Sequence, residues 1–200
     1  MEKKQDLRIV KTREAIKDAF IELVEEKGFE AMTIKDITEK ARINRGTFYA
    51  HYEDKYQCMA SYEQEFIQGM ISIAKKLRPM DQQVVEKDTP LPIAIDVFNY
   101  IFKNRNMLKA FLSSHGVPYF QEKLKQAMWE QLYEKSKIKF IDPAKMLVSP
   151  HYFSSYIAGA HISVIQTWLN NGCQESPEEM AKVLSMLTAK GPFFAAGIVT

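Results

Sequence analysis

The sequence is poor in cysteine. Its two cysteines, Cys58 and Cys173, lie far apart and in no spacing typical of metal ligands. Two isolated cysteines are typical of a protein kept in a reducing compartment. We therefore expect two free thiols, with neither a disulfide nor a bound metal.

Long apolar runs are also missing. No stretch reaches the roughly 18 apolar residues that a membrane-spanning helix needs. The first six residues carry lysines, but no apolar segment of the kind found in a secretory signal follows them. These absences predict a cytoplasmic protein without a membrane partner.

Motifs that announce catalysis are absent as well. The sequence contains no glycine-rich phosphate loop, no nucleophile elbow and no zinc-protease helix motif. We predict no catalytic residues and no cofactor. A helical enzyme that lacks a local motif stays open as the less favoured alternative.

An excess of charge of either sign is missing too. The chain has 27 basic and 25 acidic residues, and residues 1–55 carry 12 of each. Any surface that faces a nucleic acid must therefore arise from the arrangement of charge. Residues 1–13 hold five basic residues against two acidic ones. This segment is either a frayed, solvated terminus or an arm that contacts phosphates.

What the sequence does contain is helical periodicity along most of its length, with no convincing strand pattern. The pattern predicts an all-α protein. The expected long helices cover residues 7–27, 55–77, 92–103, 105–113, 118–135, 150–171 and 177–190. We expect a loop at 79–92 and irregular structure at 136–149, and the apolar tail 193–200 has no assignment.

Two short helices are predicted between residues 33 and 52, because two residues with capping side chains precede short periodic segments. Thr33 and Asn44 are the two caps, and about three residues separate the helices. Their shared core would be small and apolar: Ile37, Ala41, Ile43 and Phe48. The outer face of the second short helix would present Arg45, Gly46, Thr47, Tyr49 and Ala50. Short and donor-bearing side chains suit a DNA major groove, which admits one helix.

The segment from Thr33 to Lys55 resembles the DNA-binding signature of the tetracycline-repressor (TetR/AcrR-like) family of bacterial transcriptional regulators. The shared features include Ile43-Asn44-Arg45-Gly46-Thr47-Phe48-Tyr49 and the preceding Gly28-Phe29 pair. The resemblance covers about residues 8–60. Two departures stand out, because the family often has glycine where this chain has Arg42 and Ser or Thr where it has Asn44.

The resemblance implies a fold of two parts. Residues 1–54 would form a three-helix DNA-binding domain with a helix-turn-helix. A long fourth helix would join it to a larger helical domain, residues 55–200, that dimerises and binds an effector. The implied function is a DNA-binding transcriptional regulator, in the first place a repressor released by a small molecule. An architectural or activator protein of the same fold is the alternative.

The resemblance also implies roles for individual residues. Base edges would be approached by Arg45, Gly46 and Thr47. Phosphates would be approached by Thr33, Lys35, Tyr49, His51, Tyr52 and Lys55, with Arg42 adding a contact and Asn44 capping the recognition helix. Tyr52 is equally interpretable as a core residue and His51 as a solvated surface residue.

The second half of the sequence is less specific. The resemblance implies that the last two long helices form a dimer interface. The candidate residues are Tyr156, Ala158, Gly159, Val164, Trp168, Val183, Leu184 and Leu187. As the lining of a pocket for an apolar or cationic effector, the candidates are Phe98, Phe102, Phe111, His115, Phe120, Met128, Trp129 and His161. An ordinary intrachain core would explain either set. The expected partners are a palindromic double-stranded DNA operator, a second copy of the chain and a small-molecule effector.

Overall fold

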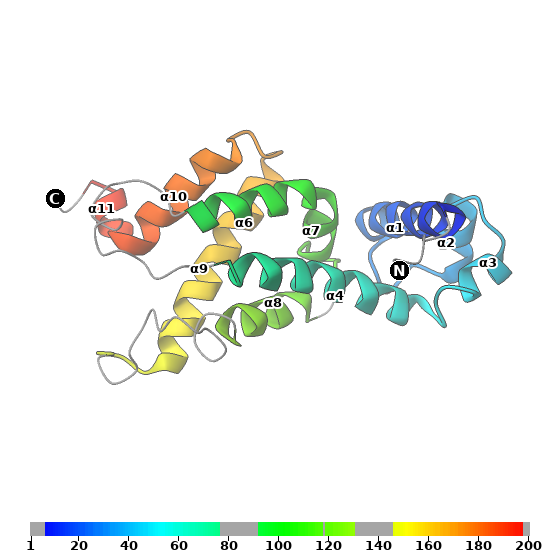
Figure 1. The fold of residues 1–200 in the computed structure, drawn as a ribbon, viewed down its shortest axis with the longest axis horizontal. Coiled ribbons are helices and arrows are strands. Elements are labelled where there is room, and N and C mark those ends of the chain that lie inside the picture. The colour runs from blue at the N-terminus through cyan, green and yellow to red at the C-terminus, as the bar shows by residue number, and fades with distance from the viewer. Residues whose placement is uncertain (1–6, 77–91, 118, 131–145, 198–200) are drawn as a thin grey trace. The chain divides into compact units, whose positions relative to one another are not determined.

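The computed structural model describes residues 7–76, 92–117, 119–130 and 146–197. Every regular element in these ranges is a helix, as Figure 1 shows. The predicted all-α class is confirmed. None of these helices combines the length and the apolar character needed to cross a membrane.

The helices lie close to where periodicity and capping residues predict them. Their bounds are α1 (Leu7–Lys27), α2 (Ile34–Lys40), α3 (Arg45–Tyr49), α4 (Lys55–Ala74), α6 (Pro92–Lys103), α7 (Arg105–Phe111), α8 (Phe120–Trp129), α9 (Pro150–Asn170), α10 (Pro177–Ala189) and α11 (Pro192–Ala195). The short helix α11 lies in the tail that the sequence left unassigned. Most of the predicted loop 79–92 and of the irregular segment 136–149 falls outside the described residues.

The chain divides into two compact units. The first unit contains residues 1–66 and 106–120, and the second contains 67–105 and 121–200. Helix α4 therefore contributes its first part to one unit and its last part to the other. The functional boundary predicted after residue 54 stays a prediction.

Buried aromatic rings hold the first unit together. Phe20 of α1 contacts Tyr62 of α4 edge to face, with ring centres 5.5 Å apart, and Phe111 of α7 at 6.1 Å. Phe111 in turn meets Phe120 at 5.3 Å. Each such pair contributes about 0.5–1.5 kcal/mol beyond the burial of its apolar area. The segment 106–120 is thus part of the same core as α1 and α4.

Ion pairs connect α1 to α2 at the surface of this unit. Lys40 pairs with Glu22 at 3.0 Å and also with Glu26, and Lys27 pairs with Asp36 at 3.0 Å. These side chains are mostly solvent-exposed, so each pair adds little stability by itself. Together they favour one orientation of the short helix α2 on the long helix α1.

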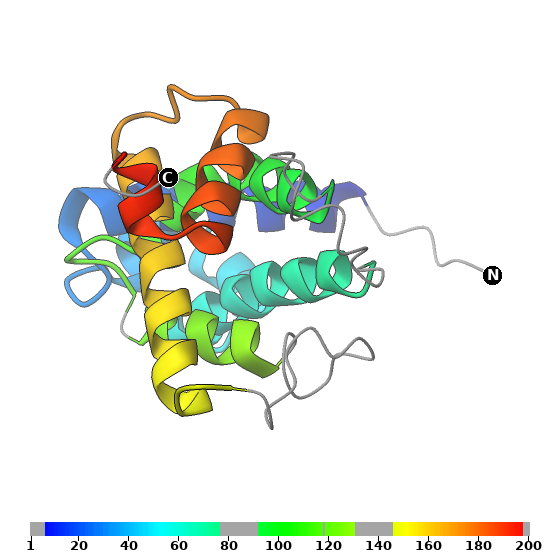
Figure 2. The same ribbon diagram turned by 90° about the vertical axis from the view of Figure 1, so that its left-hand side faces the viewer.

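The second unit is built around Trp168 of α9. Its ring contacts Phe98 of α6 at 5.5 Å, and its indole N–H donates to the carbonyl of Glu175 at 3.0 Å. Helix α10 packs chiefly against α6 and also contacts α9. Figure 2 shows α9 in yellow to orange and α10 in orange to red.

A second link joins α9 to α10. His161 Nε2 and Thr188 Oγ1 are 2.9 Å apart, and the Thr188 hydroxyl donates to the carbonyl of Leu184 at 2.7 Å. Because that hydroxyl proton is engaged, the hydroxyl oxygen accepts from His161 Nε2–H. Burial lowers the pKa of His161, which favours the neutral imidazole.

Candidate nucleic-acid interface

Helix α2 begins with a reciprocal pair of hydrogen bonds. The Thr33 hydroxyl accepts from the backbone N–H of Asp36 at 3.2 Å, while the Asp36 carboxylate accepts from the Thr33 N–H at 2.9 Å and from its hydroxyl at 2.7 Å. These bonds, followed by the ion pair with Lys27, lower the pKa of Asp36 to about 2. The charged carboxylate therefore fixes the start of α2.

The turn between α2 and α3 requires an unusual backbone conformation at Arg42. Its φ is +55°, in the left-handed region that glycine enters most easily. The Arg42 N–H bonds to the carbonyl of Glu39 at 3.2 Å, and the Ile43 N–H to that of Thr38 at 3.0 Å. This geometry explains physically why glycine would be favourable here. Arg42 itself is exposed.

Helix α3 is short and tightly fixed. The Asn44 Oδ1 atom accepts from the Thr47 N–H at 2.8 Å and from its hydroxyl at 2.9 Å. On the inner side Phe48 is fully buried. On the outer side Arg45, Gly46 and Tyr49 are exposed. A capped, anchored helix therefore presents the face that the sequence predicted.

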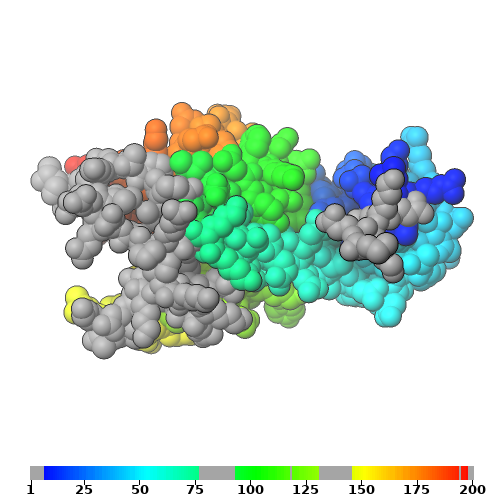
Figure 3. Space-filling view, in the orientation of Figure 1, coloured from blue at the N-terminus to red at the C-terminus, as the bar shows by residue number. Residues whose placement is uncertain are grey.

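Most of the predicted DNA-binding residues lie on the surface around this helix. Figure 1 shows α2 and α3 next to each other, and in Figure 3 their light-blue atoms lie at the surface of their unit. The exposed members are Thr33, Lys35, Arg42, Asn44, Arg45, Gly46 and Tyr49, while Thr47, His51 and Lys55 are half-buried. The structure therefore gathers these residues on one unit.

Tyr52 does not belong to that surface. Its side chain is only 4% exposed, and its ring contacts Phe48 at 5.8 Å and Tyr62 at 6.1 Å. The interpretation of Tyr52 as a core residue therefore fits the structure better than the phosphate contact. The Tyr52 hydroxyl lies beside Arg13 and raises the pKa of that guanidinium. Sequence periodicity gave no signal for this pair.

Lys55 is engaged inside the protein. Its ammonium donates to the carbonyls of Phe29, Glu30 and Met32 at 3.0, 2.9 and 3.0 Å. It also lies 4.8 Å from the centre of the Phe29 ring. An ammonium has three N–H donors, so a phosphate contact would require it to release one carbonyl. Lys55 thus orders the turn between α1 and α2.

The predicted effector residues fall into separate clusters. Phe111 and Phe120 lie in the core of the first unit, and Phe98 lies against Trp168 in the second. Phe102 is at the surface of the second unit, 6.1 Å from Trp168. Met128, Trp129 and His161 also belong to the second unit and are half-buried. The eight candidates are therefore divided between the two units, and their role as an effector site stays a prediction.

The predicted dimer residues also separate. Tyr156 and Val183 are 60% and 42% exposed, and Val164, Leu184 and Leu187 are half-buried. A Cβ placed on Gly159 would meet open space. Trp168 and Ala158, in contrast, are buried within their own chain, because they pack in the core of the second unit. Those two residues are not available to a second copy.

Two exposed apolar residues on the same helices were not among the predicted dimer residues. Tyr152 of α9 is 73% exposed and Met186 of α10 is 43% exposed. Their positions could have been found from helical spacing, since Tyr152 lies four residues before Tyr156 and Met186 three residues after Val183.

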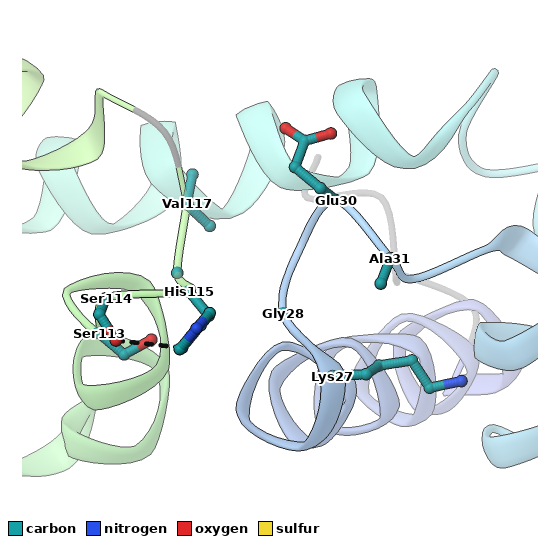
Figure 4. Close-up of a pocket in the computed structure, with 9 residues that line it drawn as sticks. Lys27, Gly28, Glu30, Ala31, Ser113, Ser114, His115 and Val117 are labelled. Carbon is teal, nitrogen blue, oxygen red and sulfur yellow. Dashed lines mark hydrogen bonds between the residues drawn. The ribbon is translucent and has the colours of Figure 1, made fainter.

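A cavity of about 400 Å³ lies in the first unit, as Figure 4 shows. It lies between the end of α1 with its following turn and the turn after α7. The lining residues are Lys27, Gly28, Glu30, Ala31, Ser113, Ser114, His115, Gly116 and Val117. Of the predicted effector residues, His115 alone belongs to this lining.

Comparison with known proteins identifies the family. Residues 16–62 match the family model described as "Bacterial regulatory proteins, tetR family", and residues 88–190 match the model "Transcriptional regulator C-terminal region" of the same family. The chain belongs to the TetR family. The resemblance seen in residues 8–60 is therefore confirmed, and it extends to the second half of this TetR-family chain.

Individual relatives can also be compared with this chain. The TetR-family chain is 28% identical over 183 residues to an uncharacterised HTH-type transcriptional regulator, YxbF, of Bacillus subtilis. That match covers 90% of this chain and 45% of the relative, so the chain spans about half the length of the relative. A TetR transcriptional regulator from Streptococcus agalactiae has the same fold, with 20% identity, a TM-score of 0.62, and coverage of 90% of this chain and 94% of the other.

A third comparison is with a fatty acid degradation regulator, FadR, from Bacillus halodurans. Its structure gives a TM-score of 0.57 at 14% identity, with coverage of 94% of this chain and 98% of the other. At such identities the solved structures establish the fold alone. The names of these relatives describe regulators.

Proposed function

We propose that this TetR-family protein is a dimeric DNA-binding repressor that a small molecule releases from its operator. The capped recognition helix α3 is the observation that carries this proposal. Its buried Phe48 and its Asn44 cap fix the helix, while Arg45, Gly46 and Tyr49 are exposed. A regulator of this kind would act in the cytoplasm, has no catalytic step and needs no cofactor.

Arg45 and Gly46 would come nearest to the bases. Arg45 is the first residue of α3, and an arginine there can donate two hydrogen bonds to a guanine, worth about 1–3 kcal/mol of discrimination. Gly46 is not required by packing, because a Cβ there would meet only Asn44 Oδ1, at 3.4 Å. A glycine that the fold does not need supports a close approach of the helix to DNA.

Phosphate contacts would surround this central region. Lys35 is 65% exposed and forms a weak pair with Glu39 at 3.7 Å, so its ammonium is available to another partner. Arg42 is exposed at the turn, and Thr33, Tyr49 and His51 border the same helices. We do not include Lys55 and Tyr52 among these contacts, since one has its donors engaged and the other is buried.

The dimer would form through α9 and α10. Tyr152, Tyr156, Val183 and Met186 expose apolar surface on these two helices. An apolar face of this kind in a water-exposed helix supports an interface with a second copy. Two copies related by a two-fold axis would place two α3 helices on the two halves of a palindrome.

An effector would bind in the second unit. The aromatic residues Phe98, Phe102 and Trp129 and the nearby Met128 supply apolar surface there, which supports an apolar molecule. Repression relieved by such a molecule is the typical role within the family.

Selection of bound DNA from a random pool, with the purified full chain, tests the proposal. We expect enrichment of one palindrome whose half-sites lie about one helical turn, or a multiple of it, apart. Scattered binding without a common sequence would support an architectural protein. Absence of any enrichment at low salt would contradict DNA binding.

A further inference from the structure

The cavity in the first unit is unlike the effector region proposed above, because it lies beside the turn that leads into α2. Its volume of about 400 Å³ falls in the range of about 300–1,000 Å³ typical of small-molecule sites. Figure 4 shows Gly28, Glu30 and Ala31 on one side and Ser114 and His115 on the other. A single backbone hydrogen bond, from the Phe29 N–H to the carbonyl of His115 at 3.1 Å, connects the two sides.

Most hydrogen-bond donors around this cavity already have partners. The backbone N–H groups of Gly28, Gly116 and Val117 donate to the carbonyls of Val24, Ser113 and Phe111. The Ser113 hydroxyl donates to the carbonyl of Ala110 at 2.9 Å. The Ser114 hydroxyl and His115 Nδ1 are paired at 3.1 Å.

The one ammonium among the residues that line the cavity is also engaged. Lys27 forms an ion pair with Asp36 at 3.0 Å, and in Figure 4 its side chain extends away from His115. Since the backbone amides have their own acceptors and this cation has its own anion, the cavity offers little to an anionic ligand.

At least one hydrogen-bond acceptor at the cavity, in contrast, has no donor in the described part of the chain. The Glu30 carboxylate forms no hydrogen bond or ion pair with any residue that the structure describes. The cavity also adjoins the C-terminal end of α1, a helix of 21 residues, where the helix dipole favours positive charge. Ala31 and Val117 add small apolar surfaces.

We propose that this cavity is a second ligand site, which binds a small organic amine in its ammonium form. The ammonium donates to the Glu30 carboxylate, and the apolar body of the ligand lies against Ala31 and Val117. His115 closes the opposite side. The site lies in the first unit and goes beyond the effector of the proposed function, so it can be tested without DNA.

The test uses three ligands that share one ring and differ in charge: benzylamine, benzyl alcohol and benzoate. Each is titrated into the isotope-labelled full chain at neutral pH, and the amide signals of Gly28, Ala31 and Gly116 are followed by NMR. We expect benzylamine to shift these signals and to bind about 10-fold or more tightly than benzoate, because the Glu30 carboxylate accepts a charge-assisted hydrogen bond from an ammonium and repels a second carboxylate.

Two variants give the result its specificity. Glu30→Gln keeps the size of the side chain and removes its charge, so the affinity for benzylamine should fall about 10-fold while that for benzyl alcohol stays unchanged. Glu14→Gln removes an exposed carboxylate on α1, outside the cavity lining, and should change neither affinity. Equal binding of benzoate and benzylamine, an unaltered affinity in Glu30→Gln, or no shift with any of the three compounds would overturn the proposal.

Discussion

Arg42 places a bulky cation where the backbone is left-handed. The left-handed region costs about 1–2 kcal/mol for a residue with a Cβ, and glycine avoids this cost. Arg42→Gly should therefore raise the free energy of unfolding by about 1 kcal/mol. If Arg42 contacts a phosphate, the same change should weaken DNA binding and reduce the salt slope by about 1 per subunit. Urea unfolding and DNA titrations at several salt concentrations measure the two effects.

Arg42→Ala is the matched control for this variant. It removes the same charge but keeps a Cβ in the left-handed conformation, so DNA binding should weaken without a gain in stability. If Arg42→Gly gives no gain either, the turn is not strained, and if both variants keep the parent salt slope, Arg42 touches no phosphate.

Lys55 should act on stability. Lys55→Met keeps most of the side-chain stem but leaves the carbonyls of Phe29, Glu30 and Met32 without their donor, which should lower the free energy of unfolding by about 1–3 kcal/mol. The salt slope of DNA binding in the folded variant should stay unchanged. Lys35→Met changes an exposed position on α2. It should reduce the salt slope of DNA binding and leave the free energy of unfolding nearly unchanged. A reduced salt slope in Lys55→Met would instead show that Lys55 contacts a phosphate.

At the scale of a single element, the start of α2 should be sensitive to acid. The Asp36 carboxyl has a pKa of about 2 in the fold against an ordinary 3.8, so its charged form is favoured by folding. Its contribution to stability is fully present above pH 3.8 and is lost as the pH falls towards 2. Asp36→Asn should lower the melting temperature at neutral pH, and the difference from the parent should shrink as the pH falls through about 2. A difference that is constant with pH would contradict this assignment.

The helices themselves could be predicted from the sequence because their signals are local. Thr33 and Asn44 cap helices with the side-chain hydrogen bonds that their positions predicted. The burial of Ile37 and Phe48 also follows from helical spacing. These features depend on residues at most a few positions apart.

The contacts between helices could not be predicted in the same way. Spacing shows that Phe98, Phe111 and Trp168 lie on apolar faces, but it does not show which other helix each face meets. Phe111 lies with Phe20 in one unit, and Phe98 lies with Trp168 in the other. The three carbonyls that hold Lys55 come from a turn more than twenty residues away, and no local pattern reveals them.

For the whole molecule, the first expectation is a homodimer in solution. Sedimentation at micromolar concentration should show a species of twice the chain mass. Tyr156→Glu and Val183→Glu should shift it towards the monomer, because each places a charge in exposed apolar surface on α9 or α10. Tyr119→Glu is the control, since Tyr119 is 80% exposed in the first unit. A monomeric parent protein would contradict the dimer, and dissociation by Tyr119→Glu would place the interface elsewhere.

The short length of α3 has a consequence for the thermodynamics of recognition. A helix of five residues is not stable by itself in water, so its order comes from the Asn44 cap and the buried Phe48. The loss of conformational entropy is therefore completed when the first unit folds, before any DNA is met. DNA binding then needs no coupled folding of the recognition helix α3. The heat-capacity change of binding therefore reflects only the surface removed from water at the groove. Specificity would come from a rigid template, and the rate of association from electrostatic steering.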